Sequence, residues 1–439
     1  MIAVLPLVAG ACGELLPVVE LEPSTSGGTT TASDSSGSGT RGPSSSSTGL
    51  EETSGTATTL ADSDASTGVP SGCGDGVPVP GEICFGEPVE IDDLAAAACI
   101  VEIGDVVHDD GDPELLVVPC GQTSLHIYAG GPAGPEPEAT VRELAPSVAA
   151  TAVRSMTLGD FSGDGRLDVV IPDSIPQVAI YTDLEPDPAI VGYGMGTASY
   201  FHVLAGDFGD DANPDLLAAS AYFAGIVIFQ GTGDIESPLT VSQMLAPMQP
   251  EYEAEVADLD LDGYSDLVLS TRAEPYRLEV FAGISGGLAT TPQYRAVPQQ
   301  VSIMATGQLD GRPGHDLVTL DAAGDVAIHP LSGSVTLGDG QVVSVGPGEV
   351  GLMATIDLDG DELDDLVTTQ LVDGDHYLVL STNVGGTSFE PRQMVALDLR
   401  TGNPDDGAFL RVADLDRDGI EDIVVVTTIS RILLLLSDP

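Results

Sequence analysis

The chain has 439 residues, and 69 acidic residues against 13 basic ones give it a formal net charge of −56. All the basic residues are arginine, so chemistries that need a lysine amine, such as a P-loop or a Schiff base, are excluded. Such acidity also opposes binding to nucleic-acid phosphates and to anionic membrane surfaces. Hydrophobic residues make up 42% of the chain, which is too many for a wholly disordered protein, so the charge must be carried by a folded domain.

Residues 1–11 are almost wholly apolar and end in small residues directly before Cys12. A short apolar stretch that ends in this way is typical of a secretory signal peptide. The cysteine after it resembles the lipidation site of bacterial lipoproteins, which implies an exported protein anchored through Cys12 to the outer membrane or cell surface. An ordinary signal peptide that contains a cysteine, with a periplasmic or secreted protein, is the alternative. No later stretch reaches the ~20 apolar residues of a membrane-spanning helix, so we expect membrane contact only through the lipid.

Residues 12–70 are rich in Ser, Thr and Gly and poor in apolar residues, so we expect a flexible linker. A small segment with cysteines follows at 71–92, and between Cys73 and Cys84 it resembles short CGDG…PGE.C modules of bacterial surface proteins. Beyond Cys12 the chain has four cysteines, and an even number in an exported protein favours disulfides. Zinc is the competing interpretation, but no paired C-x-x-C spacing supports it. We predict a Cys73–Cys84 bond, and a second bond is derived below.

Residues 93–439 contain an acidic loop seven times, at intervals of about 50 residues. In the clearest copy, 258–266, aspartates stand at positions 1, 3, 5 and 9 and glycine at position 6. Carboxylates so spaced in a tight turn converge on one point, and a main-chain carbonyl at position 7 adds to the six to eight oxygens that Ca²⁺ prefers. Mg²⁺ suits such a site less, because it usually keeps several waters. Solvated turns that happen to be rich in Asp are the alternative.

These loops differ from EF-hands, which need a glutamate at position 12 and a helix on each side. In the loop at 258–266, position 12 is Leu269, and it lies within a run typical of a β-strand. Each repeat also contains a second apolar strand that ends at glycine. Four short strands in each of seven repeats predict an all-β fold, a seven-bladed β-propeller.

The repeats resemble FG-GAP or VCBS repeats, which form the blades of integrin α-subunit propellers, of related bacterial surface proteins and of a fungal lectin. In that family the acidic loop joins the first two strands of a blade and holds Ca²⁺ at one rim. The resemblance therefore implies about four to six mainly structural calcium ions. The residues that it implies as ligands are Asp160, Ser162, Asp164 and Asp168; Asp258, Asp260, Asp262 and Asp266; Asp357, Asp359, Asp361 and Asp365; and Asp414, Asp416, Asp418 and Asp422. Weaker candidates are Asp105, Asp110 and Glu114 in the first copy and Asp207, Asp211 and Asp215 in the third, and the fifth copy, which begins at Gln308, is expected to be empty.

The last repeat ends soon after its apolar strand at 432–436, so we expect residues 88–93 to supply the outer strand of the last blade and close the ring. In the first repeat, the strands that flank the acidic loop are expected to form a hairpin with Gly104 opposite Leu115. This register places Cys99 opposite Cys120, at a Cα separation of about 4.5 to 5.5 Å that a disulfide can bridge.

No residue is predicted to be catalytic, and we expect the protein not to be an enzyme. Gly283, Ser285 and Gly287 match the nucleophile-elbow pattern, but that elbow needs a strand-to-helix turn and this stretch is expected between strands. The sequence favours a calcium-binding, surface- or periplasm-exposed module that binds protein or glycan ligands, as in adhesion. A polysaccharide-acting enzyme or its accessory subunit, and a lectin, are the alternatives.

Overall fold

The chain divides into two units, Met1–Gly68 and Val69–Pro439. The computed structural model describes residues 83–437 of the second unit, apart from short gaps. The predicted signal peptide, the lipidation site Cys12, the whole predicted linker and Cys73 therefore lie outside the described residues. The gaps are 87, 95, 108–110, 145–154, 174–176, 183, 185–188, 195–201, 210, 212, 221–224, 235, 246–250, 387, 398–406 and 428–430.

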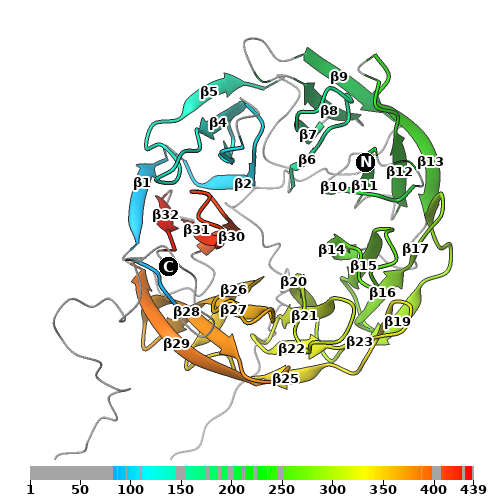
Figure 1. The fold of residues 1–439 in the computed structure, drawn as a ribbon. Helices are drawn as coiled ribbons and strands as arrows, with labels where there is room; N and C mark the ends of the chain where they lie inside the picture. Colours follow the sequence, from blue (N-terminus) through cyan, green and yellow to red (C-terminus); the bar gives the residue numbers. More distant parts are fainter. Residues whose placement is uncertain are drawn as a thin grey trace, which may run out of the picture. The chain divides into compact units, whose positions relative to one another are not determined.

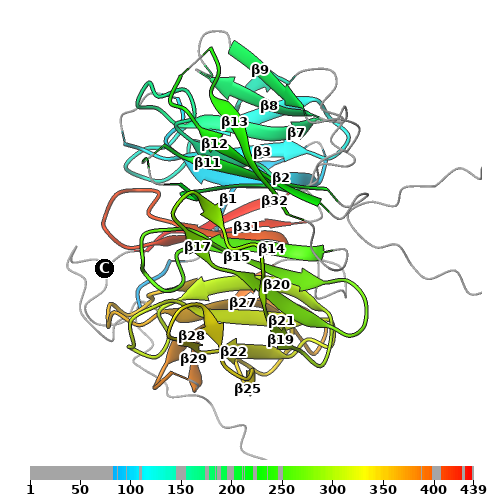
Figure 2. The ribbon, with the colours of Figure 1, turned by 90° about the vertical axis from the view of Figure 1, so that its right-hand side faces the viewer.

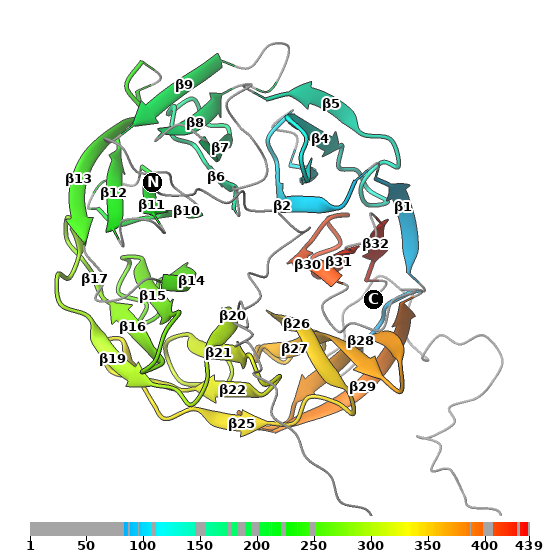
Figure 3. The ribbon, with the colours of Figure 1, turned by 180° about the vertical axis from the view of Figure 1, so that it is seen from behind.

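The described residues form seven four-stranded antiparallel sheets arranged in a ring, which confirms the predicted seven-bladed β-propeller (Figures 1 and 3). Figure 2 shows the same ring from the side. In each blade the strands follow one another from the inside of the ring outward. Among the described residues no helix is long and apolar enough to cross a membrane.

Blades 1 to 3 use consecutive strands. Their bounds are β2 (Ala98–Gly104), β3 (Glu114–Pro119), β4 (Ser124–Tyr128) and β5 (Thr140–Glu143) in blade 1; β6 (Thr157–Gly159), β7 (Asp168–Asp173), β8 (Gln177–Thr182) and β9 (Ala189–Gly194) in blade 2; and β10 (His202–Gly206), β11 (Asp215–Ser220), β12 (Gly225–Gly231) and β13 (Leu239–Leu245) in blade 3.

Blades 4 and 5 each insert a small two-stranded hairpin before the outer strand. Their bounds are β14 (Glu251–Ala257), β15 (Asp266–Thr271), β16 (Arg277–Phe281) and β19 (Gln293–Ala296), with the hairpin β17 (Gly283–Ile284) and β18 (Gly287–Leu288), in blade 4; and β20 (Val301–Gly307), β21 (Asp316–Asp321), β22 (Val326–His329) and β25 (Gln341–Val343), with the hairpin β23 (Leu331–Ser332) and β24 (Thr336–Leu337), in blade 5.

Blades 6 and 7 complete the ring. Their bounds are β26 (Glu349–Ile356), β27 (Asp365–Val372), β28 (Asp375–Asn383) and β29 (Phe389–Leu397) in blade 6, and β30 (Gly407–Ala413), β31 (Asp422–Thr427), β32 (Arg431–Leu435) and β1 (Val89–Asp93) in blade 7.

The core consists of apolar clusters between adjacent blades. Because side chains alternate across a strand, β31 sends Val424 and Val426 into the cluster shared with blade 1 and Ile423 and Val425 into the one shared with blade 6. This is why β31, the second strand of its blade, contains a continuous apolar run from Ile423 to Val426, all of it buried. The outer strand β19, by contrast, is mostly exposed, as expected for a polar outer strand.

The ring closes where β1, from the amino-terminal side of the propeller, pairs with β32 near the carboxyl end, and Val89 lies opposite Leu434 (Figure 1). This confirms the expected outer strand of blade 7. Phe85 extends the junction through a β-bridge to Ser437. Phe85 also packs against the apolar cluster between blades 6 and 7.

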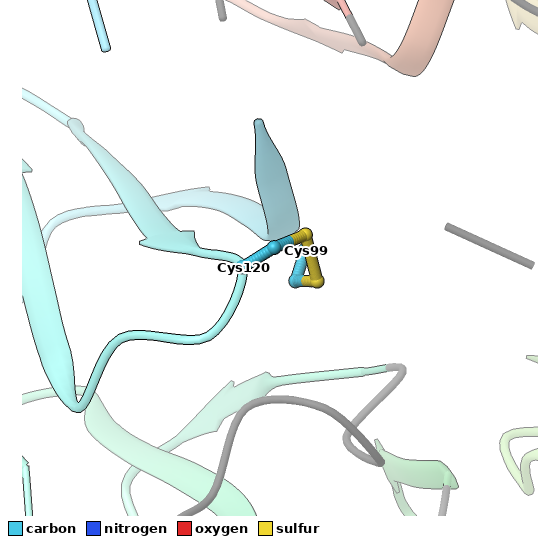
Figure 4. The surroundings of a disulfide bond; sticks show 2 residues. All are labelled: Cys99 and Cys120. Atoms are coloured by element: carbon cyan, nitrogen blue, oxygen red, sulfur yellow. A yellow bond between two sulfur atoms is a disulfide. The ribbon is translucent and has the colours of Figure 1, made fainter. Parts of the chain in front are cut away.

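The predicted Cys99–Cys120 disulfide is present, with Cα atoms 4.8 Å apart (Figure 4). The register on which the prediction rested is wrong by one residue, because Gly104 lies opposite Glu114 rather than Leu115. A β-bulge between Ala98 and Ile100 shifts the register by one more residue, so Cys99 lies in the bulge and bonds to Cys120 without standing directly opposite it. Cys84 is also disulfide-bonded, and its predicted partner, Cys73, lies outside the described residues.

Removing the disulfide of blade 1 should destabilise the propeller. The bond joins residues 21 apart in the sequence, and closing a loop of this size is worth about 3 kcal/mol in chain entropy. We expect the Cys99→Ala/Cys120→Ala variant to lose about 2 to 4 kcal/mol of unfolding free energy in denaturant titrations. An unchanged midpoint and slope would show that the bond contributes nothing to stability.

Candidate metal-binding loops

The acidic loops join the first and second strands of the blades, as the sequence predicts. Every blade repeats the same strand order around the ring, so the seven loops lie at the same rim. We number them loops 1 to 7 in chain order, with positions 1 to 9 as defined above. They span 105–114, 160–168, 207–215, 258–266, 308–316, 357–365 and 414–422.

Main-chain hydrogen bonds fold loop 4 around its carboxylates. The carboxylate of Asp258 accepts from the N–H groups of Asp262 at 3.0 Å and of Gly263 at 2.9 Å. Asp262 in turn accepts from the N–H of Tyr264 at 3.0 Å. Gly263 has a φ of 93°, which favours glycine at position 6. Loops 2 and 6 share this bonding, through Asp160 and Asp357.

This folding brings the predicted ligands together in three loops. In loop 4, carboxylate oxygens of Asp258, Asp260 and Asp262 lie within 4.8 Å of one another. Loop 6 gathers its residues at positions 1, 3 and 5 in the same way, and loop 7 gathers those at positions 1, 3 and 9. Burial, then the neighbouring carboxylates, raises the pKa of Asp260 at position 3.

The aspartate at position 9 has a further role that the sequence did not indicate. In loop 4, Asp266 is 1% exposed, and its Oδ2 accepts from the N–H of Leu259 at 2.8 Å. Its Oδ1 accepts from the N–H of Gly283, just after the third strand, at 2.6 Å. The same carboxylate therefore joins the acidic loop to the end of β16. Burial raises its pKa to about 6.

Five loops contain, at position 1 or 3, a buried oxygen that lacks any hydrogen-bond donor. At position 3 these are Oγ of Ser162 and Oδ1 of Asp260 and Asp359; at position 1 they are Oδ1 of Asp105 and Asp414. A buried oxygen without a partner is costly, and a cation would satisfy it. All the side-chain atoms that could coordinate a metal in these loops are oxygens, and oxygens are the ligands that hard cations such as Ca²⁺ prefer. The residues of these loops therefore fit a calcium ion.

Loop 5, expected to be empty, satisfies its side-chain oxygens at positions 1 and 3, although the buried Oδ2 of Asp316 at position 9 has no donor. The side-chain amide of Gln308 donates to the carbonyls of Arg312 and, at 3.2 Å, of Gly314, which stands at position 7. The guanidinium of Arg312 pairs with Asp310 at 3.3 Å. Amide and guanidinium hydrogens thus bind oxygens that would face a cation in the other loops.

Loops 1 and 3, the weaker candidates, differ from each other. In loop 1, Glu114 accepts from the N–H groups of Val106 at 2.8 Å and Val107 at 3.1 Å, while Asp110 lies outside the described residues. In loop 3, position 3 is Gly209, which has no side-chain ligand, and the amide of Gln230 donates to Asp211 at 2.9 Å. Loop 3 therefore fits a cation less well than loops 2, 4, 6 and 7.

A cavity beside loop 5 was not foreseen from the sequence. It has a volume of about 380 Å³, and its lining includes Asp310 and Arg312 of blade 5 and Leu363 and Gly386 of blade 6. Because its walls come from two blades, no local motif could reveal it. The one available signal was Arg312, a basic residue at a position that is acidic in the neighbouring loops.

The innermost strands place a second unforeseen group of charges together. Arg411 of β30 pairs with Glu102 of β2 at 3.4 Å, and its guanidinium donates to the carbonyl of Val101 at 3.2 Å. Burial raises the pKa of Glu255 on β14 to about 7, and Arg411 opposes that rise. The sequence match to a nucleophile elbow is not a strand-to-helix turn, because Ser285 lies exposed in the turn of the β17–β18 hairpin.

Comparison with known proteins supports the fold. Residues 357–425, from loop 6 into β31, match the model of the FG-GAP-like repeat family. A crystal structure of BBS1N in complex with ARL6DN, soaked with mercury, is similar with a TM-score of 0.57 and 12% identity over 83% of this chain and 98% of that one. The lead-soaked form of that complex has a TM-score of 0.56 and 12% identity over 81% of this chain and 97% of that one. The structure of YCF48 bound to D1 peptide has a TM-score of 0.50 and 11% identity over 82% of this chain and 98% of that one. At these identities the likeness shows the fold alone. No protein with a curated description matches in sequence.

The acids at position 9 predict how the stability of the metal-free protein depends on pH. Burial raises the pKa to about 7 for Asp168, Asp365 and Asp422 and to about 6 for Asp266, whereas an unfolded chain has about 3.9. The folded state therefore binds more protons between these values, and the free energy of unfolding should fall as pH rises from about 4 to 7. Urea titrations in EDTA at pH 5 and 7.5 measure this. A higher stability at pH 7.5 would contradict it, and Asp266→Asn should reduce the slope.

Proposed function

We propose that this protein is a calcium-stabilised β-propeller that acts outside the cytoplasm as a binding module for a protein or glycan ligand. The buried, unpartnered oxygens of Asp260, Asp359 and Asp414 carry the calcium part of this proposal, because each lies among carboxylates and lacks a donor. Export is supported by the apolar amino end before Cys12 and by the Cys99–Cys120 disulfide, a bond that forms and persists mainly in oxidising compartments.

Calcium would act mainly on stability. Without a cation, three carboxylates of like charge share one loop, and their repulsion opposes the folded state. An ion bound at positions 1, 3 and 5 would neutralise that repulsion and supply the missing partner of Asp260 in loop 4 and of Asp359 in loop 6. Because position 9 joins loops 4 and 6 to the third strands of their blades, ordering these loops would also brace the blades.

The binding role is supported by the scaffold and by the cavity between blades 5 and 6. Propellers present rigid loops and crevices between blades, and such concave sites with a few convergent polar groups are where ligands bind. Here the carboxylate of Asp310, the guanidinium of Arg312 and the amide of Gln341 line the cavity beside the apolar Leu363. A lipid on Cys12 and a flexible linker would hold this module at the cell surface. We propose no catalytic residue.

Removing calcium should destabilise the protein. Each saturated site adds about 2.7 kcal/mol at an ion concentration of 100 times its Kd, so the Tm should be clearly higher in excess Ca²⁺ than in EDTA. Calorimetric titration should give about four to six ions per chain, and Asp260→Asn should remove one of them.

The matched control is Asp310→Asn, at the same position of loop 5, where Gln308 and Arg312 already satisfy the loop. This variant should bind as many ions as the wild type. Identical melting curves in EDTA and calcium would refute the calcium proposal, and equal ion loss in both variants would refute the assignment of loop 5 as empty.

The binding role is tested with glycan arrays and with pull-downs from outer-membrane extract. Selective binding that falls about tenfold in Arg312→Ala would place the ligand in the cavity, as expected for one lost charge-assisted hydrogen bond. Arg166→Ala, in loop 2 and away from the cavity, serves as the control. Turnover of a polysaccharide would instead favour the enzyme alternative, and no retained ligand in either assay would count against a binding module.

A further inference from the structure

Neighbouring acidic loops are directly bonded to one another. At three consecutive junctions the N–H at position 8 of one loop donates to a main-chain carbonyl at position 1 or 2 of the preceding loop. These bonds run from Ser265 to Asp207 at 2.7 Å, from His315 to Leu259 at 2.8 Å and from Asp364 to Gln308 at 2.8 Å. The loops of blades 3 to 6 thus form a chain of contacts along the rim.

The junction between blades 7 and 1, where the ring closes, is built differently. In loop 1 the residue before the last acid is Pro113, which has no N–H to donate. The side chain of Arg417, from loop 7, makes the junction instead. Its Nε donates to the carbonyl of Gly111 at 2.7 Å and lies 2.7 Å from the carboxylate of Asp112.

Arg417 makes these contacts with loop 1 from a left-handed backbone conformation. It stands at position 4 of loop 7 with a φ of 64°. In loops 2, 5 and 6 the equivalent residue, also at positive φ, is Gly163, Gly311 or Gly360, and in loop 4 it is Leu261, with a φ of 57°. Position 4 therefore accepts different side chains, and in loop 7 it carries an arginine that reaches loop 1.

Loop 7 also binds the carboxyl end of the propeller. The N–H of Ser437 donates to Asp422 at 2.8 Å, and its hydroxyl donates to Asp418 at 3.0 Å. Ser437 in turn forms the β-bridge to Phe85, just before β1. Residues at positions 4, 5 and 9 of this one loop therefore contact blade 1 and the strand ends that close the ring.

We propose that loop 7 is a calcium-dependent lock on the ring closure, with Arg417 as the positioning residue that transmits it. The inference rests on the proposed calcium binding. An ion held by Asp414, Asp416 and Asp422, whose oxygens lie within 4.8 Å of one another, fixes the loop backbone on both sides of Arg417. Calcium in this loop then secures the junction of blades 7 and 1, whereas calcium in loop 4 braces only its own surroundings.

Hydrogen exchange of the full chain, with calcium and with EDTA, tests the lock. In the wild type, calcium should slow exchange in β1, β32 and residues 111–114 by about tenfold or more. Asp416→Asn should abolish this protection at the closure while blades 3 to 5 stay protected. The matched variant Asp260→Asn, at the same position of loop 4, should keep the closure protected. Equal loss in the two variants would overturn the proposal.

A second pair of variants tests the contacts of Arg417 separately from calcium binding. Arg417→Gly installs the residue that three other loops have at position 4, so calorimetry should give the wild-type number of ions, while protection of residues 111–114 falls to the EDTA level. Arg417→Lys, which retains the charge, should restore part of it. Unchanged protection in Arg417→Gly would overturn the role of Arg417. A wild type that binds no calcium would overturn the proposed function and the lock together, whereas binding without the site-specific effects would overturn the lock alone.

Discussion

The blades depend on the hydrogen bonds that the buried carboxylate at position 9 of the acidic loop accepts. In loops 3 to 7 it accepts from a main-chain N–H at the end of the third strand or two residues beyond it, as Asp266 does from Gly283 and Asp316 does from Leu331. It is buried, and it connects the acidic loop to a strand that lies elsewhere in the blade. Loop 5 keeps Asp316 although it has lost its acids at positions 1 and 5. The last acid of the loop therefore serves the fold, and the earlier ones are free to serve a cation or to be lost.

Local sequence determined most of the architecture. The spacing of the acidic loops predicted the number of blades, because every repeat contains one acidic loop and its own apolar strands. It also predicted that β1 completes blade 7, since the last repeat lacks an outer strand. The hairpin register around Cys99 was misjudged by one residue at the acidic loop, where Gly104 lies opposite Glu114, and the bulge at Cys99 shifts it once more.

The rest of the site depends on contacts between blades, which a repeat pattern cannot contain. The loops were found from their spacing, but the buried oxygens of Ser162 and Asp260 became visible only with their surroundings. The cavity is lined by Arg312 and by Leu363 of the next blade. At the ring closure, Arg417 forms an ion pair with Asp112, which lies near the other end of the domain sequence. Each pair is distant in sequence, so the repeat that contains one member does not reveal the other. The internal bonding of loop 5 was the exception, because Gln308 and Arg312 are visible departures from the pattern.

The pairing of β1 with β32 also constrains the route by which the chain reaches its fold. Hairpins within a blade form between residues close in sequence, so the inner three strands of blades 1 to 6 can assemble as soon as they are made. The contact between Val89 and Leu434 spans nearly the whole domain and carries the largest loop-closure cost. Until β32 is in place, both partners present unpaired edges, which are templates for strand exchange with another chain. We therefore expect closure to be a late step of folding, and blade 7 to be the place where a domain-swapped dimer would form.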